Sequence, residues 1–169
     1  MRSVFLGVCS LLVAGCTATY QSSPIPSHHA KLVRGKTLLI ATPVNGSYEG
    51  REYANSGNMT ASALRSAFGI AGGPAEVSVE CRDLACLRGV PSRAADYYVV
   101  PEILHWEDRS TEWSGAPDRI EIKVAVFASD GTEIASTIIT GKSKWATFGG
   151  DHPQDLLPKP LGDFVNSIY

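Results

Sequence analysis

An excess of positive charge is missing from this sequence. Its 169 residues hold 15 Lys and Arg against 17 Asp and Glu, which gives a formal net charge of -2. A protein that binds nucleic acid by neutralising phosphates needs a basic excess, so the composition argues against that class. Apolar residues at 44% and charged residues at 19% are also unlike the composition of a disordered chain. The length suits one compact domain.

Motifs for catalysis and cofactors are missing as well. The sequence has no Gly-x-Gly-x-x-Gly, no Walker A motif and no Gly-x-Ser-x-Gly elbow, so we predict no cofactor and no enzymatic activity. Asp151-His152 with Ser114 or Ser143 is one of many such combinations in a chain of this size. We interpret His152 as a residue that caps or precedes the last helix. A hydrolase that uses His152 or His105 stays an alternative.

A hydrophobic run long enough to span a bilayer is also absent from the N-terminus. Val4 to Val13 is an apolar run of ten residues, interrupted by Gly7 and Ser10, whereas a membrane-spanning helix needs about 20. A run of this length after Arg2 is typical of a secretory signal. We therefore predict that residues 1–15 are a signal peptide.

The end of this run, Leu12-Val13-Ala14-Gly15-Cys16, resembles the lipobox of bacterial lipoproteins. The resemblance implies cleavage after Gly15, a diacylglyceryl group on Cys16 and an acylated amine, so that several acyl chains hold the protein on a membrane. Thr17 in place of Asp implies the outer membrane. Residues 16–34 are rich in Ser, Thr and Pro, which predicts a flexible tether, and we interpret His28-His29 as a solvated pair.

The remaining chain alternates strand and helix patterns. Apolar runs predict strands at 36–43, 76–80, 95–106, 120–126 and 134–140, and helical spacing predicts helices at 58–68, 83–88 and 157–168. We predict a bulge or an edge-facing position at Pro101 and a helix end at Gly69. The fold class is α/β (α+β-like): one domain over 35–169, with helices packed on a mixed sheet of about five strands. The order is β-α-β-(α)-β-β-β-α, with an antiparallel C-terminal meander.

Two cysteines stay available after processing, because Cys9 leaves with the signal and Cys16 takes the lipid. In an oxidising compartment, Cys81 and Cys86 favour a disulfide over two free thiols. Five residues apart on one helix is too far for a bridge, so Cys81 must lie before the helix. The spacing is not Cys-x-x-Cys, which argues against a redox-active pair, and no further zinc ligands are adjacent.

The segment between the predicted strands at 95–106 and 120–126 is dense in Trp, Arg and acidic residues. One interpretation is a long hairpin in which Trp106 and Trp113 pair across the strands. Another is a partner-binding surface, formed by Trp106, Glu107, Asp108, Arg109, Glu112 and Trp113. A cation site built on Glu107, Asp108, Glu112 and Asp118 is a third, although its spacing does not match an EF-hand. We predict no metal site.

The run LHWEDRSTEWSGAPDRIEIKV, followed by DGTEIAS, resembles a family of proteobacterial envelope lipoproteins known only as a domain of unknown function. The similarity extends more weakly over most of 36–169. The element order is also similar to the amino-terminal domain of TolB and to CsgG-like lipoproteins, although fold similarity carries no function. We predict a non-enzymatic outer-membrane lipoprotein that faces the periplasm and binds an envelope protein. A small-ligand or metal carrier is the alternative beside the hydrolase.

Overall fold

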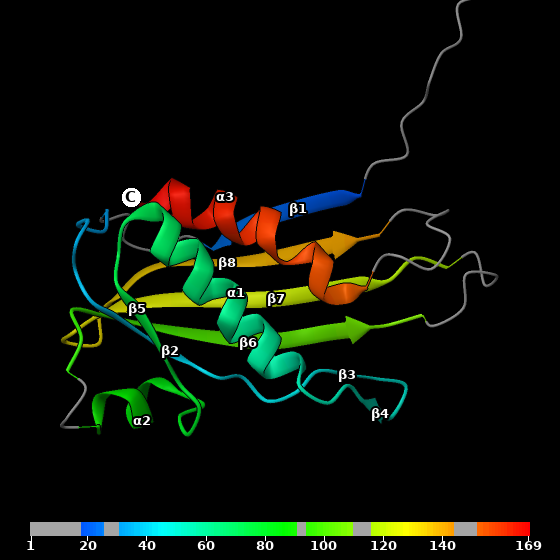
Figure 1. The fold of residues 1–169 in the computed structure, drawn as a ribbon, viewed down its shortest axis with the longest axis horizontal. Helices are drawn as coiled ribbons and strands as arrows, with labels where there is room; N and C mark the ends of the chain where they lie inside the picture. Colours follow the sequence, from blue (N-terminus) through cyan, green and yellow to red (C-terminus); the bar gives the residue numbers. More distant parts are fainter. Residues whose placement is uncertain (1–17, 26–30, 91–93, 110–115, 144–151) are drawn as a thin grey trace, which may run out of the picture.

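The five strands predicted from the sequence lie side by side in one sheet of the computed structural model, which describes residues 18–25, 31–90, 94–109, 116–143 and 152–169. They are β2 (Leu38–Ala41), β5 (Ala75–Ser78), β6 (Tyr97–Glu107), β7 (Arg119–Ala128) and β8 (Glu133–Lys142). With a sixth strand, β1 (Thr19–Ile25), the sheet order is β1-β8-β7-β6-β2-β5. The predicted mixed α/β sheet with an antiparallel C-terminal meander is confirmed (Figure 1).

The sheet has a parallel half and an antiparallel half. β2 pairs in parallel with β5 on one side and with β6 on the other. The helix α1 (Ser56–Ala71) connects β2 to β5, as parallel neighbours require a crossover. β6, β7 and β8 then form the meander. Two short strands, β3 (Ser47–Tyr48) and β4 (Arg51–Glu52), make a separate hairpin between β2 and α1.

The prediction of a flexible tether over 16–34 is wrong for Thr19–Ile25. These residues form β1, which pairs antiparallel with β8 from Thr19↔Lys142 to Ile25↔Ser136. The Ser22 and Thr137 hydroxyls lie 3.0 Å apart in a hydrogen bond across this pair. Leu32 is buried, and its N–H donates to the Ile168 carbonyl at 2.7 Å. The segment has no apolar period because an edge strand buries little of its surface.

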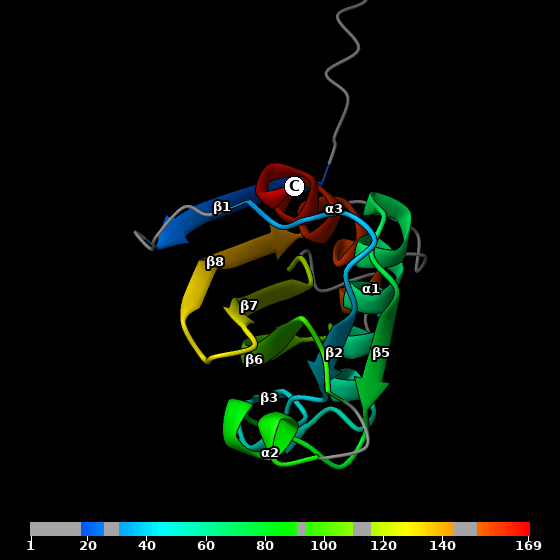
Figure 2. The same cartoon turned by 90° about the vertical axis from the view of Figure 1, so that its left-hand side faces the viewer.

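Two helices cover one face of the sheet. α1 and α3 (Pro158–Ile168) lie together on it (Figure 2), because every second residue of the strands there is apolar and buried. The 3-10 helix η2 (Pro153–Leu156) leads into α3. Within the described residues, this face and its helices share the main core, which includes Ile40, Leu64, Phe68, Ile122, Val124, Leu161 and Val165.

The helix α1 runs three residues past its predicted end. Gly69 lies inside it, and the helix ends at Gly72, which has a left-handed φ of 110° and donates its N–H to the Phe68 carbonyl. A glycine at this position is favoured because it takes a left-handed conformation without strain. At the other end, the Gly57 N–H donates to Asn45 Oδ1 at 3.1 Å, so the cap comes from the loop after β2.

The irregularity in β6 lies after Pro101. Pro101 pairs in register with Val124, and the register shifts between Ile103 and His105 instead. Pro101 is tolerated because β2 pairs only with Tyr97 to Val99, so the neighbouring strand has already ended. The bulge at Leu104 reverses the faces, which turns Trp106 toward the helices and Glu107 toward the opposite face.

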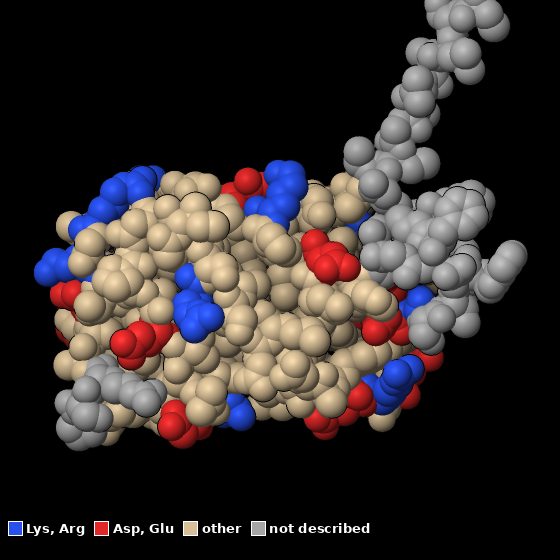
Figure 3. All heavy atoms as spheres, in the orientation of Figure 1, with Lys and Arg blue, Asp and Glu red and all other residues tan. Residues whose placement is uncertain are grey.

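Charged side chains of both signs are scattered over the face formed by α1 and α3, with uncharged areas between them (Figure 3). Among the described residues no helix is long and apolar enough to cross a membrane.

Candidate functional site

A buried carboxylate ends β6. Glu107 is only 3% exposed, and the Arg109 Nε group donates to its Oε1. His105 Nε2 lies 3.1 Å from Oε2, and Arg119 Nε lies 4.0 Å from the same oxygen. A buried carboxylate is costly unless it is paired and hydrogen-bonded. Three neighbours meet that requirement here.

These neighbours set the protonation of Glu107. Burial alone raises the pKa of the carboxyl group, but hydrogen bonds from His105 and Arg109, with the charges of Arg109 and Arg119, outweigh burial and lower the pKa below its ordinary value. The side chain is therefore an anion at neutral pH. Its role is to hold basic groups in place, since its oxygens already accept hydrogen bonds.

Arg109 joins this carboxylate to the two neighbouring elements. Its backbone N–H donates to Asp118 Oδ1 at 2.6 Å, which links the second residue after β6 to the residue before β7. Its guanidinium lies over the Tyr48 ring, 5.6 Å from the ring centre, and Nη2 lies 3.4 Å from the Tyr48 hydroxyl. Tyr48 also meets the His105 ring edge-on at 5.0 Å.

Asp118 fixes the other side of the same segment. It is buried, its N–H donates to Ser143 Oγ at 2.9 Å, and the Ser143 N–H donates back to its carbonyl at 3.0 Å. Hydrogen bonds thus join the end of β6, the start of β7 and the end of β8. We call this the loop base, formed by Tyr48, His105, Glu107, Arg109, Asp118 and Arg119.

The structure divides the six residues predicted to bind a partner. Trp106 is 2% exposed and lies opposite Ile120 in the main core, so its prediction as a surface anchor is wrong. Glu107 is buried in the loop base. Asp108 is half-buried and Arg109 exposed, so both reach the surface. Glu112 and Trp113 lie outside the described residues, as does any pairing of Trp106 with Trp113.

Tyr48, Asp118 and Arg119 belong to the loop base, although none of them is among the six predicted partner-binding residues. Tyr48 lies in the stretch 45–57, between the predicted strand at 36–43 and the predicted helix at 58–68. The sequence does contain a hint of such a cluster, since residues 105–119 have more acidic residues than Arg residues. Acidic side chains that become buried need basic or hydrogen-bonding neighbours. Gly46 belongs to the same stretch, and a Cβ there would lie 2.5 Å from Trp106 Cβ. Only glycine lets the β3–β4 hairpin approach the indole this closely.

Both histidines of the hydrolase alternative lie next to an acidic side chain. His152 is the N-cap of η2, as predicted, and its N–H donates to Asp155 Oδ2 at 3.0 Å. Its Nδ1 lies 3.8 Å from Asp108 Oδ1. His105 contacts Glu107, which Arg109 also binds. Ser143 supports Asp118, while Ser114 and Asp151 lie outside the described residues. Within the part of the chain that is described, no three His, Cys, Asp or Glu side chains gather as metal ligands would.

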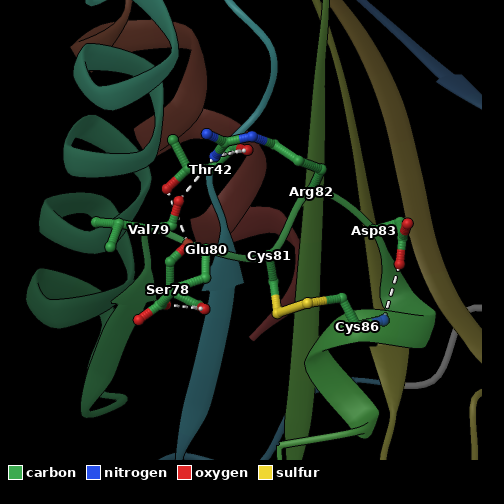
Figure 4. The surroundings of a disulfide bond; sticks show 8 residues. All are labelled: Thr42, Ser78, Val79, Glu80, Cys81, Arg82, Asp83 and Cys86. Atoms are coloured by element: carbon green, nitrogen blue, oxygen red, sulfur yellow. Dashed lines mark hydrogen bonds between the residues drawn. A yellow bond between two sulfur atoms is a disulfide. The ribbon is translucent and has the colours of Figure 1, made fainter.

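Cys81 and Cys86 form the predicted disulfide. Their Cα atoms are 5.3 Å apart, and Cys81 precedes α2 (Leu84–Arg88) while Cys86 lies within it (Figure 4). The Cys86 N–H donates to Asp83 Oδ1 at 2.8 Å, which caps this short helix. Cys81 packs in a second, smaller core with Leu39, Ala41, Leu87 and Tyr98. The bond thus fixes α2 against the face that α1 leaves uncovered.

A polar pocket of about 260 Å³ lies at the carboxyl ends of β2 and β5. Its lining residues are Thr42, Pro43, Val44, Asn45, Glu52, Asn55, Asn58 and Arg82. Arg82 crosses from the loop after β5 and donates to the carbonyls of Thr42 and Val79 at 2.8 and 3.0 Å (Figure 4). The chain leaves β2 toward α1 on one face and leaves β5 toward α2 on the other. In open α/β sheets, ligands often bind at the carboxyl ends of two neighbouring strands whose connections go to opposite faces of the sheet. No motif in the sequence predicts this pocket.

Comparison with known proteins identifies a family that matches most of the chain and solved structures of similar fold. A family defined as a domain of unknown function, DUF4823, matches residues 30–168. The fold is similar to the PelC dodecamer from Paraburkholderia phytofirmans, with a TM-score of 0.67 and 10% identity over 90% of this chain and 97% of that one. A variant of that PelC gives a TM-score of 0.64 and 10% identity, over 89% of this chain and 98% of that one.

A Xanthomonas campestris protein of the DUF330 family gives a TM-score of 0.46 and 18% identity over 83% of this chain and 93% of that one. No curated protein sequence matches the chain. The predicted similarity to a family of domains of unknown function is confirmed, while the similarity to TolB and CsgG stays a prediction. At these identities the solved structures support the fold alone.

Proposed function

The chain belongs to the DUF4823 family of domains of unknown function, and we propose that it is a lipid-anchored accessory protein of the outer membrane. In this proposal Cys16 carries the lipid, the domain faces the periplasm, and it binds another envelope component without catalysing a reaction. The loop base is the observation that carries the binding role. It fixes Arg109 and Asp118, which flank the predicted partner-binding residues Glu112 and Trp113 in the sequence, and binding residues are often found on segments that a rigid scaffold positions.

The lipidated N-terminus is supported by residues 12–16 and by the cysteines. Residues 1–17 lie outside the described part of the structure, so the lipobox remains the basis for anchoring at Cys16. The Cys81–Cys86 bond fits an oxidising compartment such as the periplasm. Both features agree with a protein that is exported and then kept at a membrane.

Self-association is part of the proposal. PelC, which has a similar fold, is a dodecamer. In this chain β1 and β5 are the two edges of the sheet, and strand edges pair readily with other chains. We propose that copies of this domain assemble as well. Light scattering of the Cys16→Ser protein tests this: a mass of several chains supports assembly, and a monomer at all concentrations contradicts it.

Affinity capture from membranes tests the binding role. The lipidated wild type is compared with a Glu112→Gln/Trp113→Ala variant, which changes the two predicted partner-binding residues that the structure does not describe. Arg65→Ala, an exposed position on α1, is the matched control. We expect the double variant to lose a partner that the wild type and the control retain. Identical partners for all three contradict a role for the loop.

A second candidate, a small-ligand carrier, is favoured by the pocket between β2 and β5. Its amide, carboxylate and guanidinium groups suit a small polar ligand. Native mass spectrometry of the protein released gently from membranes tests it. A bound small molecule that is lost in Asn58→Leu, but retained in Arg65→Ala, supports the carrier. An unliganded wild type contradicts it.

A further inference from the structure

Four strand ends form one row at a single end of the sheet. Thr19 begins β1, and its register partner Lys142 ends β8. Lys142 is also opposite Arg119, which begins β7, and Arg119 is opposite Glu107, which ends β6. In Figure 1 this is the end at which the arrows of β6 and β8 finish. We call Thr19, Lys142 and Arg119 the anchor-proximal end.

The length of chain between this end and Cys16 is short. Cys16 precedes Thr19 by three residues, and three extended residues span at most about 11 Å. Thr19 is held in the sheet by its pairing with Lys142. If Cys16 carries the lipid, Thr19 therefore lies within about 11 Å of the acylated cysteine in any arrangement of the intervening chain. Lys142 and Arg119, which lie at the same end of the sheet as Thr19, are therefore also near the acylated cysteine.

Two basic side chains, those of Arg119 and Lys142, are neighbours at the anchor-proximal end. Arg119 and Lys142 are directly opposite in the β7–β8 register and both are exposed. Opposite residues of a pair point to the same face, where like charges destabilise the sheet. Arg119 lies 4.0 Å from Glu107, whereas Lys142 has no ion pair within the described residues. Glu121, the next residue on this face of β7, lies about 6–7 Å further from the end.

From these observations we propose that the anchor-proximal end lies against the membrane surface, where Lys142 and Arg119 contact the phosphates of lipid headgroups. This rests on the proposed lipidation of Cys16. Basic residues next to a membrane anchor are attracted to anionic lipids, and here they also relieve their mutual repulsion. The loop base shares Arg119 with this end. A partner bound there is consequently recognised close to the bilayer.

The opposite end of the sheet provides an internal control. Lys36 precedes β2 and forms an ion pair with Asp96 at 3.2 Å, with half of its side chain exposed. Asp96 precedes the first residue of β6, and β6 runs from there to Glu107 over about 33 Å. Lys36 therefore stays far from the bilayer when Lys142 lies on it. Lys142 and Lys36 can therefore be compared in one protein, with Lys142 near the bilayer and Lys36 far from it.

Amine labelling on vesicles tests the orientation. Lipidated wild type is reconstituted into phosphatidylethanolamine and phosphatidylglycerol vesicles and treated with a membrane-impermeant acetylating reagent. The Cys16→Ser protein in solution, at the same concentration, is treated identically, and mass spectrometry measures Lys142 and Lys36. We expect the Lys142 rate, relative to Lys36, to fall at least fivefold on vesicles.

An unchanged ratio on vesicles that retain the protein overturns the orientation and leaves lipid anchoring intact. Flotation of the vesicles before labelling separates the two proposals. Protein that does not float, and whose Cys16 lacks acyl chains, overturns both.

Discussion

The backbone N–H of Arg109 donates a 2.6 Å hydrogen bond to the carboxylate of Asp118. This bond joins the end of β6 to the start of β7 across residues 110–115. The same arginine binds Glu107 through its side chain, so one residue fixes both the path of the backbone and the charge of the buried carboxylate.

Glu107→Gln tests the importance of that carboxylate. We expect the free energy of unfolding to fall by about 1.5–3 kcal/mol at pH 7, the usual range for a hydrogen bond to a charged group. Because the folded pKa of Glu107 is lowered, the contribution is complete above the ordinary glutamate pKa of about 4.3 and is lost as the pH falls through the folded value. Urea titrations at several pH values measure it.

Glu102→Gln is the control on the same strand. Glu102 is exposed and lies 4.0 Å from Lys123, so its substitution should change stability by less than about 0.5 kcal/mol. A Glu107→Gln protein as stable as this control at pH 7, or a deficit that persists in acid, contradicts the account of Glu107.

Trp106→Ala should destabilise the fold and thereby weaken binding only indirectly. Removing a buried indole costs about 3–5 kcal/mol, and Trp106 packs against Gly46 and lies opposite Ile120. Leu104→Ala, two residues earlier and 42% exposed, should cost less than about 1 kcal/mol. Thermal unfolding of both variants measures the difference. If the two variants lose the same free energy of unfolding, the Trp106 indole does not pack in the core.

Reduction of Cys81–Cys86 should lower the free energy of unfolding by about 2 kcal/mol, because the closed loop is short. A Cys81→Ala/Cys86→Ala variant should no longer respond to reductant. Denaturant titration with and without a thiol measures both. A wild type that is equally stable after verified reduction would show that packing of Leu87 and Tyr98 alone holds α2.

The pairing of β1 with β8 is tested by hydrogen exchange. Deleting residues 17–25 from the Cys16→Ser protein should speed exchange of amides in 136–142, since β8 becomes the sheet edge. Amides of β6, two strands away, serve as the reference. Unchanged exchange in β8 would mean that Thr19–Ile25 does not pair in solution.

The strands of the buried sheet were predictable because each has its own apolar pattern. β7 alternates Ile120, Ile122 and Val124 with polar residues, and that period alone fixes its two faces. β1 has no such pattern, because an edge strand with Gln21, Ser22 and Ser23 is stabilised mainly by backbone pairing. No local pattern in β1 indicates its partner strand β8, which lies more than a hundred residues away in the sequence.

The loop base was only partly predictable for a related reason. The sequence located a dense cluster of charges, but the bulge after Ile103 decides which of them point inward. In a strand without this bulge, Glu107 would face the helices and Trp106 would face the opposite side of the sheet. The pocket between β2 and β5 requires knowledge of strand order, which no local pattern contains.

Mass spectrometry of the mature protein isolated from membranes tests the central claim most directly. The account predicts an N-terminal residue at Cys16, with a diacylglyceryl group on its sulfur and an acyl chain on its amine, and a Cys16→Ser protein that is absent from the membrane fraction. A mature chain that begins elsewhere, or an unmodified Cys16 on membrane-bound protein, would contradict it.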